Sequence, residues 1–144
     1  MSGLFSKILI PVDLAELIVL KSALEKAVAL ANWCGADFRL VNVQNLLPLT
    51  FMDYVPADFD DLQKREASAQ LINMESKIAL PKERVSSCVR IGSIYSEILS
   101  EADEWGADLI VVGSHRPAMS TYLLGSNAKT IVRHAKCSVL VVRD

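Results

Sequence analysis

The segment Gly113–Asn127 holds the densest group of side chains that could bind an anion. Gly125-Ser126-Asn127 stands where a helix is expected to begin, and the free N–H groups and positive dipole end of a helix N-terminus favour phosphate. Arg116 offers a fork of donors suited to phosphate oxygens. Gly113 would let the chain turn sharply out of a strand and approach a ligand closely. Further donors are the hydroxyl groups of Ser114, Ser120, Thr121 and Ser126. Together these residues predict a phosphate-binding segment.

A purely structural interpretation of the same residues stays open at this point. Gly113 could simply end a strand, and Ser126 or Asn127 could cap a helix, a position that both residue types favour. Neither GxxxxGK[ST] nor GxGxxG occurs in the chain, which argues against a P-loop enzyme and against a dinucleotide-binding Rossmann domain.

Acid and base candidates are few. Asp13 follows an apolar run and could accept hydrogen bonds from a ligand, although an aspartate there is often a turn former or a cap. His115 could contact phosphate or act as a base, but His134 is expected at the far end of the last helix, so no triad forms around His115. The three cysteines lie far apart without CxxC spacing, which argues against a zinc site or a disulfide framework. We therefore predict no catalytic residue and no metal bound by the chain alone.

The elements that must position these residues alternate between strand and helix. Short apolar runs bounded by turn residues predict five strands, at 7–13, 38–43, 85–91, 108–113 and 138–142. Apolar residues at helical spacing predict helices at 17–33, 59–80 and 94–105, and a fourth that ends at 133 after a loop over 114–121. A long loop is expected over 45–57.

This alternation predicts a doubly wound α/β fold, an open sheet of five mostly parallel strands with four helices, in a single domain over residues 1–144. The run 108–113 is expected to be a central strand, buried on both faces. Ligands of such sheets lie beyond the carboxyl ends of the strands, where the winding direction reverses. Three such ends can converge: Pro11–Asp13, Asn42–Gln44 and Gly113–Arg116.

Composition excludes several classes of protein. With 144 residues, 51% of them hydrophobic and 22% charged, the chain is suited to one compact soluble domain. Fifteen basic against seventeen acidic residues give a net charge of −2, too little positive charge for general binding to nucleic acid. No apolar run is long enough for a membrane span, and the start MSGLFSKILIPVD is unlike a signal peptide, so we expect a cytoplasmic protein.

Three segments resemble the universal stress protein family: ILIPVD, the Gly92-Ser93 element, and the ending ADLIVVGSHRPAMSTYLLGSNAKTIVRHAKCSVLVVR. The resemblance covers essentially the whole chain and implies the same α/β fold. ATP-binding members share the pattern Gly, two residues, Gly, nine residues, Gly, then Ser or Thr. Here Gly113 matches the first glycine and Gly125-Ser126 the last pair, whereas Arg116 replaces the second glycine and eight residues follow it. This variant is similar to the subgroup of the enterobacterial F and G paralogues, which implies binding of an adenine nucleotide.

By matching position, the resemblance implies that ATP is the ligand. Pro11, Val12 and Asp13 would lie at the base and ribose, Val43 would pack on the adenine, and Gly113–Asn127 would hold ribose and phosphates. Asp13 would accept hydrogen bonds from the base or ribose, or bind a Mg²⁺ ion held by the phosphates. The implied role is a stress response or regulation.

The resemblance also implies a homodimer. The apolar run Val139–Val142 would expose unpaired backbone groups if it formed a sheet edge, and family members commonly pair these last strands across a two-fold axis. Alternatives remain: a nucleotide-free signalling or interaction protein in which Arg116 blocks the phosphate site, a slow or autophosphorylating ATPase, and an enzyme of the adenine nucleotide hydrolase type. Linkage to a transporter is a further possibility, and nothing in the chain names a protein partner.

Overall fold

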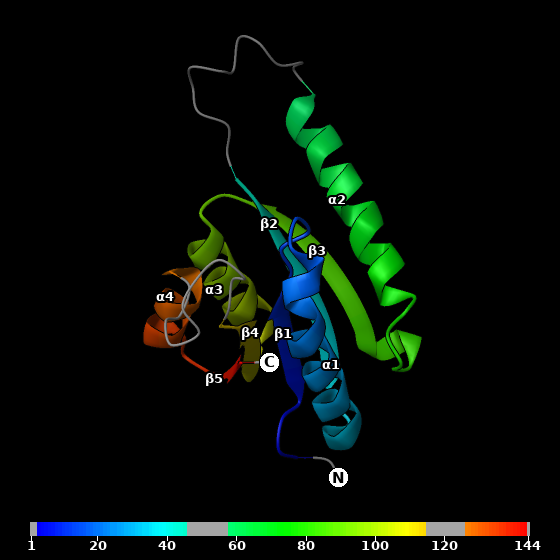
Figure 1. Ribbon diagram of the computed structural model, residues 1–144, viewed down its shortest axis with the longest axis vertical. Helices are drawn as coiled ribbons and strands as arrows, with labels where there is room; N and C mark the ends of the chain where they lie inside the picture. The colour runs from blue at the N-terminus through cyan, green and yellow to red at the C-terminus, as the bar shows by residue number, and fades with distance from the viewer. Residues whose placement is uncertain (1–2, 46–57, 115–125, 144) are drawn as a thin grey trace.

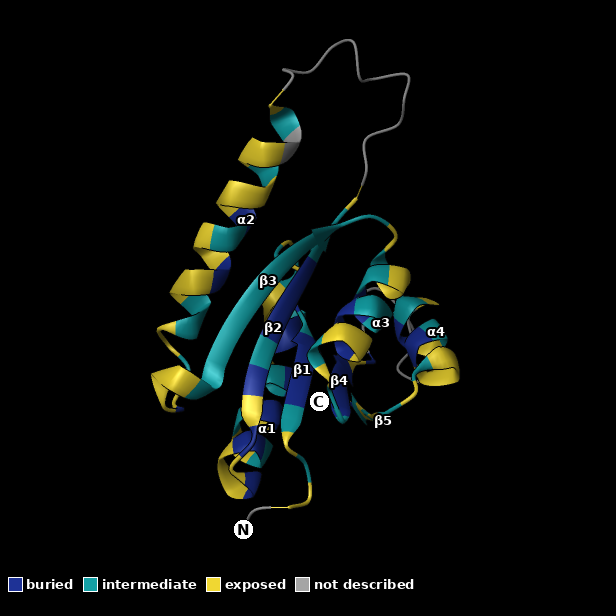
Figure 2. Ribbon diagram, turned by 180° about the vertical axis from the view of Figure 1, so that it is seen from behind, coloured by how far each residue is buried: buried dark blue, intermediate teal, exposed yellow. Residues whose placement is uncertain are grey.

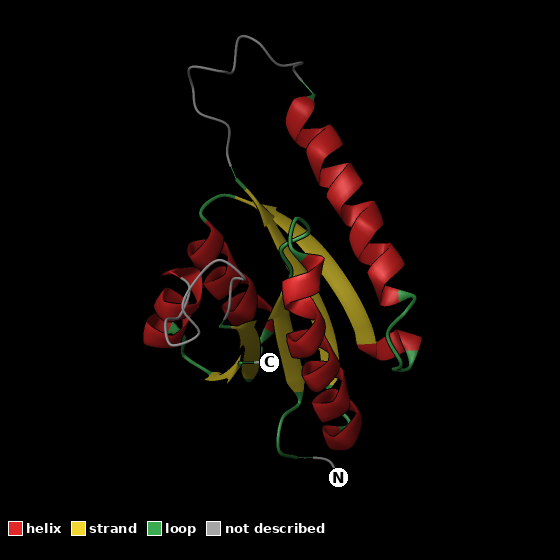
Figure 3. Ribbon diagram, viewed as in Figure 1, coloured by secondary structure: helices red, strands yellow, loops and turns green. Residues whose placement is uncertain are grey.

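The computed structural model describes residues 3–45, 58–114 and 126–143 of the chain. Helices and strands alternate within these ranges (Figure 1, Figure 3). In chain order they are β1 Lys7–Pro11, α1 Leu17–Cys34, β2 Asp37–Gln44, α2 Phe59–Glu75, the 3-10 turn η2 Lys82–Arg84, β3 Val85–Ile91, α3 Ile94–Trp105, β4 Leu109–Gly113, α4 Ser126–His134 and β5 Ser138–Val142. The predicted loop over 45–57 and the loop over 114–121 lie, apart from their first residues, outside the described residues.

The five strands form one sheet in the order β3-β2-β1-β4-β5, and every neighbouring pair is parallel. Helices α1 and α2 cover one face, and α3 and α4 cover the other (Figure 1). The winding direction therefore reverses between β1 and β4. This is the doubly wound α/β fold that the sequence predicts.

The core consists of two apolar layers, one on each side of the sheet. Successive residues of a strand point to opposite faces, so Ile8 and Ile10 of β1 pack toward α1 and α2, whereas Leu9 packs toward α3 and α4. In β4, Leu109 and Val111 likewise pack toward α1 and α2, whereas Ile110 and Val112 pack toward α3 and α4. All four residues are buried (Figure 2). The prediction of a strand buried on both faces is confirmed for β4.

Helix α1 packs closely against the sheet because small residues form its buried face. Ala23, Ala27 and Ala31 recur at a spacing of four and are almost fully buried. The helix ends at Gly35, whose φ of 72° lies in the left-handed region that favours glycine. Its N–H donates to the carbonyl of Ala31, which completes the helix end.

Helix α2 is shorter than the sequence predicts. It ends at Glu75 instead of residue 80, and tight turns follow. The Ser76 hydroxyl donates to the Asn73 carbonyl at 2.6 Å, and this kind of local side-chain bond competes with helix continuation. Leu80 lies beyond the helix but is still buried against the sheet, which explains why the apolar pattern runs on past the last turn.

Polar side chains connect neighbouring segments where the strands begin. The Asp108 carboxylate, just before β4, accepts hydrogen bonds from the backbone N–H groups of Ser6 and Lys7 at 2.8 and 2.9 Å. Just before β3, the Arg84 guanidinium donates to the carbonyls of Ala31 and Ala36 at distances down to 2.7 Å. This end of the sheet is tied together by direct side-chain to backbone bonds.

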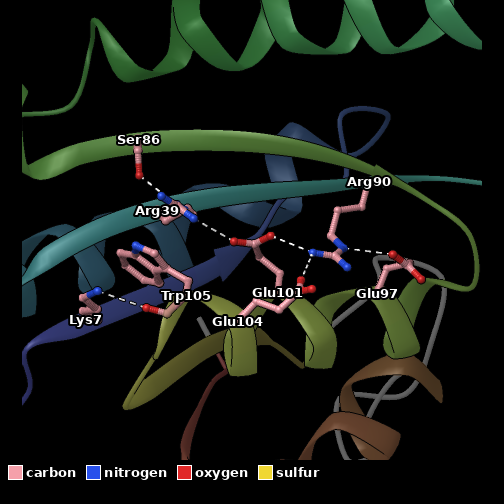
Figure 4. A network of polar contacts seen from close by, with 8 residues as sticks. All are labelled: Lys7, Arg39, Ser86, Arg90, Glu97, Glu101, Glu104 and Trp105. Carbon is pink, nitrogen blue, oxygen red and sulfur yellow. Dashed lines mark hydrogen bonds and ion pairs between the residues drawn. The ribbon is translucent and has the colours of Figure 1, made fainter.

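A charged cluster joins α3 to β2 and β3 (Figure 4). The Glu101 carboxylate lies between two arginines, 2.8 Å from Arg39 and 2.9 Å from Arg90, and its side chain is only 9% exposed. Burial raises the pKa of Glu101, but the hydrogen bonds from the two arginines outweigh it and hold the pKa below the usual 4.5. Glu101 is therefore an ionised, paired carboxylate.

The thiol of Cys88 lies beside this cluster. Burial, followed by the charge and the hydrogen bond of Glu101, raises the pKa of Cys88 to about 12. A thiolate is the nucleophilic form of cysteine, and the raised pKa keeps the Cys88 thiol protonated at neutral pH.

Candidate functional site

A cleft of about 650 Å³ opens at the carboxyl ends of the strands. Its lining comes from the ends of β1, β2 and β4, from the segment that follows β1, and from helices α1, α2, α3 and α4. It lies at the reversal of winding between β1 and β4, where ligands of doubly wound sheets bind. Its volume falls within the range typical of small-molecule and cofactor sites.

The structure brings together every predicted site residue that it describes. Eight of them line this one cleft: Pro11, Val12, Asp13, Val43, Gly113, Ser114, Ser126 and Asn127. The other five predicted residues lie outside the described residues: His115, Arg116, Ser120, Thr121 and Gly125. Strand ends and the start of a helix, separated by more than 100 residues in the sequence, thus form one surface.

Asp13 has a structural role as well as a place in the cleft. Its carboxylate accepts a hydrogen bond from the backbone N–H of Ala15 at 3.0 Å, and its carbonyl accepts one from Glu16 at 3.0 Å. This is the turn-forming arrangement that aspartate favours after a strand. A carboxylate has two acceptor oxygens, so the turn leaves capacity for a ligand.

Gly113 does not make the sharp turn that the sequence predicts. Its backbone lacks a positive φ, and a Cβ built there would meet only the Cβ of Ala23, at 4.0 Å. The next residue, Ser114, is buried and still pairs with β5 through a 3.0 Å bond from its N–H to the Val142 carbonyl. Neither the backbone conformation nor a close contact therefore requires glycine at 113.

The N-terminus of α4 faces this cleft. Helix α4 begins at Ser126, which is exposed, and no acidic residue lies in its first turn. Arg133 and His134 occupy the last turn, where positive charge complements the helix dipole. The first N–H groups of a helix have no partner within the helix and carry its partial positive charge, which makes the start of α4 a suitable environment for an anion.

A row of hydrogen-bonded amides forms another side of the cleft. The Asn42 amide donates to the Val12 carbonyl at 2.8 Å, the Gln44 amide donates to the Asn42 side-chain oxygen, and the Gln63 amide donates to the Gln44 oxygen at 2.6 Å. We call Asn42, Gln44 and Gln63 the amide chain. It links β1, β2 and α2, and all three residues line the cleft.

Sequence reasoning did not identify the side of the cleft that α2 provides. Its lining residues are Gln63, Glu66, Ala67 and Gln70. Their spacing of three and four residues places them on one face of the helix. A polar stripe at helical spacing beside the buried Leu71 is a signal that could have found them.

Two classes of feature are absent from the described residues. Within 3–45, 58–114 and 126–143, no three histidine, cysteine or acidic side chains gather as ligands for a metal ion. In the same ranges, no helix has the length and apolar character needed to cross a bilayer.

Comparison with known proteins identifies the family. The universal stress protein family matches residues 4–143. Universal stress protein G of Shigella flexneri is 35% identical over 146 residues, which cover 97% of this chain and 100% of that protein. The same protein of Salmonella typhimurium is 32% identical with the same coverage.

Solved structures share the fold. Universal stress protein UspA from Lactobacillus plantarum superposes with a TM-score of 0.78 at 22% identity, covering 98% of this chain and 99% of that one. A universal stress protein in complex with cAMP has a TM-score of 0.70 at 18% identity, covering 97% and 98%. The universal stress protein from Archaeoglobus fulgidus in complex with dAMP has a TM-score of 0.63 at 18% identity, covering 96% and 98%. From the family match, the identity to the G proteins and the fold that it shares, this chain belongs to the universal stress protein family.

Proposed function

We propose that this protein binds ATP in the cleft at the carboxyl ends of the strands and acts in the cytoplasm as a regulatory stress-response protein. The observation that carries the proposal is the convergence of residues expected at base, ribose and phosphate on one cleft of about 650 Å³. Two structural relatives are described as complexes with cAMP and dAMP, both adenine nucleotides, which supports the class of ligand.

In the proposed complex, the base and ribose lie against Pro11, Val12 and Asp13, and the adenine packs on Val43. The phosphates lie at the start of α4, beside Ser126-Asn127, where the N–H groups and the helix dipole favour negative charge. The remaining phosphate contacts come from Gly113, Ser114, His115, Arg116, Ser120, Thr121 and Gly125. A Mg²⁺ ion would be held mainly by phosphate oxygens, with Asp13 as its protein ligand.

Release of the bound ligand tests this proposal directly. Freshly purified, untreated protein should release close to one ATP per chain on denaturation, identified by mass spectrometry. Protein stripped of this ligand should bind ATP on calorimetric titration, with ADP and AMP titrated beside it. A chain that releases no nucleotide and gives no heat with any of the three would contradict the proposal and favour an interaction protein without nucleotide.

We also propose that the protein forms a homodimer through β5. This strand is at one edge of the sheet, and Leu140 within it is 38% exposed. An edge strand offers unpaired N–H and C=O groups to a second chain. Pairing of the segment Val139–Val142 with the same segment of a second copy would satisfy these groups and cover Leu140.

The variant Leu140→Lys should convert the dimer to a monomer, because Leu140 is exposed in the single chain and the charged side chain that replaces it would be buried at the interface. Light scattering coupled to gel filtration measures the mass, and circular dichroism checks that the variant folds. Ile72→Lys is the matched control, since Ile72 is an exposed residue of α2, which packs at the opposite edge of the sheet. A folded Leu140→Lys dimer would place the interface elsewhere.

A further inference from the structure

The cleft extends beyond the residues that we assign to the nucleotide. Helices α1 and α2 cover the same face of the sheet (Figure 1). Helix α1 packs mainly over β4 and β1, whereas α2 packs mainly over β3, and side chains of both helices line the cleft. Val19 and Leu20 of α1 form one wall, and Gln63, Glu66 and Ala67 of α2 form the other. We call this part of the cleft the α1–α2 groove.

Apolar side chains are exposed along both rims of the groove. Leu17 is 44% exposed and lies one turn before Leu20, on the same side of α1. Leu62 is 42% exposed and lies one turn before Glu66, on the same side of α2. Ile18, beside Leu17, is 91% exposed. Large apolar side chains gathered at the surface beside a groove are typical of an interaction site.

The groove carries negative charge. Glu16 precedes the first turn of α1, Glu66 lies on α2, and with Asp13 they are the charged residues that the described part of the chain contributes to the cleft lining. Within the described ranges, neither Glu16 nor Glu66 takes part in an ion pair. Lys21 lies one turn after Leu17 but does not line the cleft. The groove therefore combines apolar rims with unpaired carboxylates.

We propose that the α1–α2 groove binds a cationic amphipathic helix of a partner protein. A groove of this kind can accept a helix that lays its apolar face into it. Apolar residues of the partner at a spacing of three or four would contact Leu17, Ile18 and Leu62. Lysine or arginine beside them would face Glu16 and Glu66, whereas an acidic helix would meet like charge. The inference is independent of ATP binding, since none of these five residues is assigned to the nucleotide.

Two synthetic peptides test the chemistry of the partner. The first has about 18 residues, five helical turns, and consists of leucine at helical spacing with lysine at the other positions. The second has the same pattern with glutamate in place of lysine. Fluorescence anisotropy of the labelled peptides on native protein should show about tenfold tighter binding of the leucine–lysine peptide. Equal affinity for the two peptides, or no binding of the leucine–lysine peptide, would overturn the proposal.

Variants locate the binding on the protein. Ile18→Ser should weaken binding of the leucine–lysine peptide about tenfold, because an apolar contact is lost. Glu66→Lys should weaken it about tenfold and strengthen binding of the leucine–glutamate peptide, a reversal that general adsorption would not produce. Ile72→Ser and Glu25→Lys are the matched controls, since both residues are exposed on the same two helices outside the cleft lining. Both controls should keep the native affinities.

Two further results would contradict the proposal. Native peptide affinity in folded Ile18→Ser and Glu66→Lys would mean that the peptide binds elsewhere on the protein. A second copy of the chain is the other occupant to test, by light scattering without peptide. A native mass that falls in Ile18→Ser would assign the groove to self-association. Circular dichroism confirms that each variant is folded. Failure of native protein to bind ATP would remove the proposed function and leave this inference standing.

Discussion

Replacement of Ser126 by glutamate should weaken ATP binding about 100-fold and leave the stability of the fold unchanged or slightly higher. Ser126 is the exposed first residue of α4 and lines the cleft where we place the phosphates. A carboxylate there would interact favourably with the helix dipole, by about 0.3–1 kcal/mol. The same carboxylate would occupy the N–H groups that the phosphates need and repel their charge. Binding and stability should therefore respond differently.

Calorimetry with ATP and urea unfolding measure the two effects on the same preparations. Ser126→Gln is the matched control, because glutamine has nearly the shape of glutamate without its charge, and we expect it to lose only a few-fold in affinity. Native ATP affinity in Ser126→Glu would mean that the phosphates do not lie at the start of α4.

Glu101→Ala should lower the free energy of unfolding by about 2–3 kcal/mol, the largest stability effect that we predict for a polar residue. The substitution leaves Arg39 and Arg90 without the carboxylate between them. Removal of one partner from a fully buried ion pair costs about 3–5 kcal/mol. We expect less here because the two arginine side chains are 25% and 23% exposed, so water replaces part of the lost interaction.

Glu104→Ala is the control for this substitution. Glu104 also pairs with Arg90, at 2.6 Å, but its side chain is 66% exposed, so its loss should cost at most about 1 kcal/mol. Urea denaturation measures both variants. Equal unfolding midpoints for Glu101→Ala and the native chain would show that the buried position of Glu101 contributes nothing to stability.

The lowered pKa of Glu101 also predicts a pH dependence. A carboxyl group whose pKa is lower in the folded than in the unfolded chain stabilises the fold above its unfolded pKa. This contribution is complete above pH 4.5 and is lost as the pH falls through the lower value of the folded protein. In Glu101→Gln, the decline of stability below pH 4.5 should be less steep.

Most of the fold could be predicted because its signals are local. Apolar runs between turn residues located each strand to within one or two residues, and helical spacing located the end of α1 to within one residue. The end of α2 could not be predicted in this way, since Leu80 continues the apolar pattern after the Ser76 hydroxyl has taken part in ending the helix. Leu80 is thus buried without being part of the helix, and the apolar pattern of the sequence indicates burial alone.

The site was predictable where topology determines it. Parallel strands bring Asp13, Val43 and Ser114 to one edge whatever their side chains do, so their convergence followed from the order of elements. The amide chain depends instead on tertiary packing, because Gln44 and Gln63 meet only when α2 lies against the sheet. Nothing in the spacing of these glutamines indicates that contact.

The bonds of Asp108 and Arg84 lie where the strands begin, at the end of the sheet away from the cleft. Residues at the cleft end of the sheet can therefore be substituted during evolution, because the bonds at the opposite end keep the strands in register. Divergence among relatives should accordingly be tolerated around the cleft with little loss of foldability. A new ligand specificity could be engineered by randomising the cleft residues, with Asp108 and Arg84 kept unchanged to hold the strands in position.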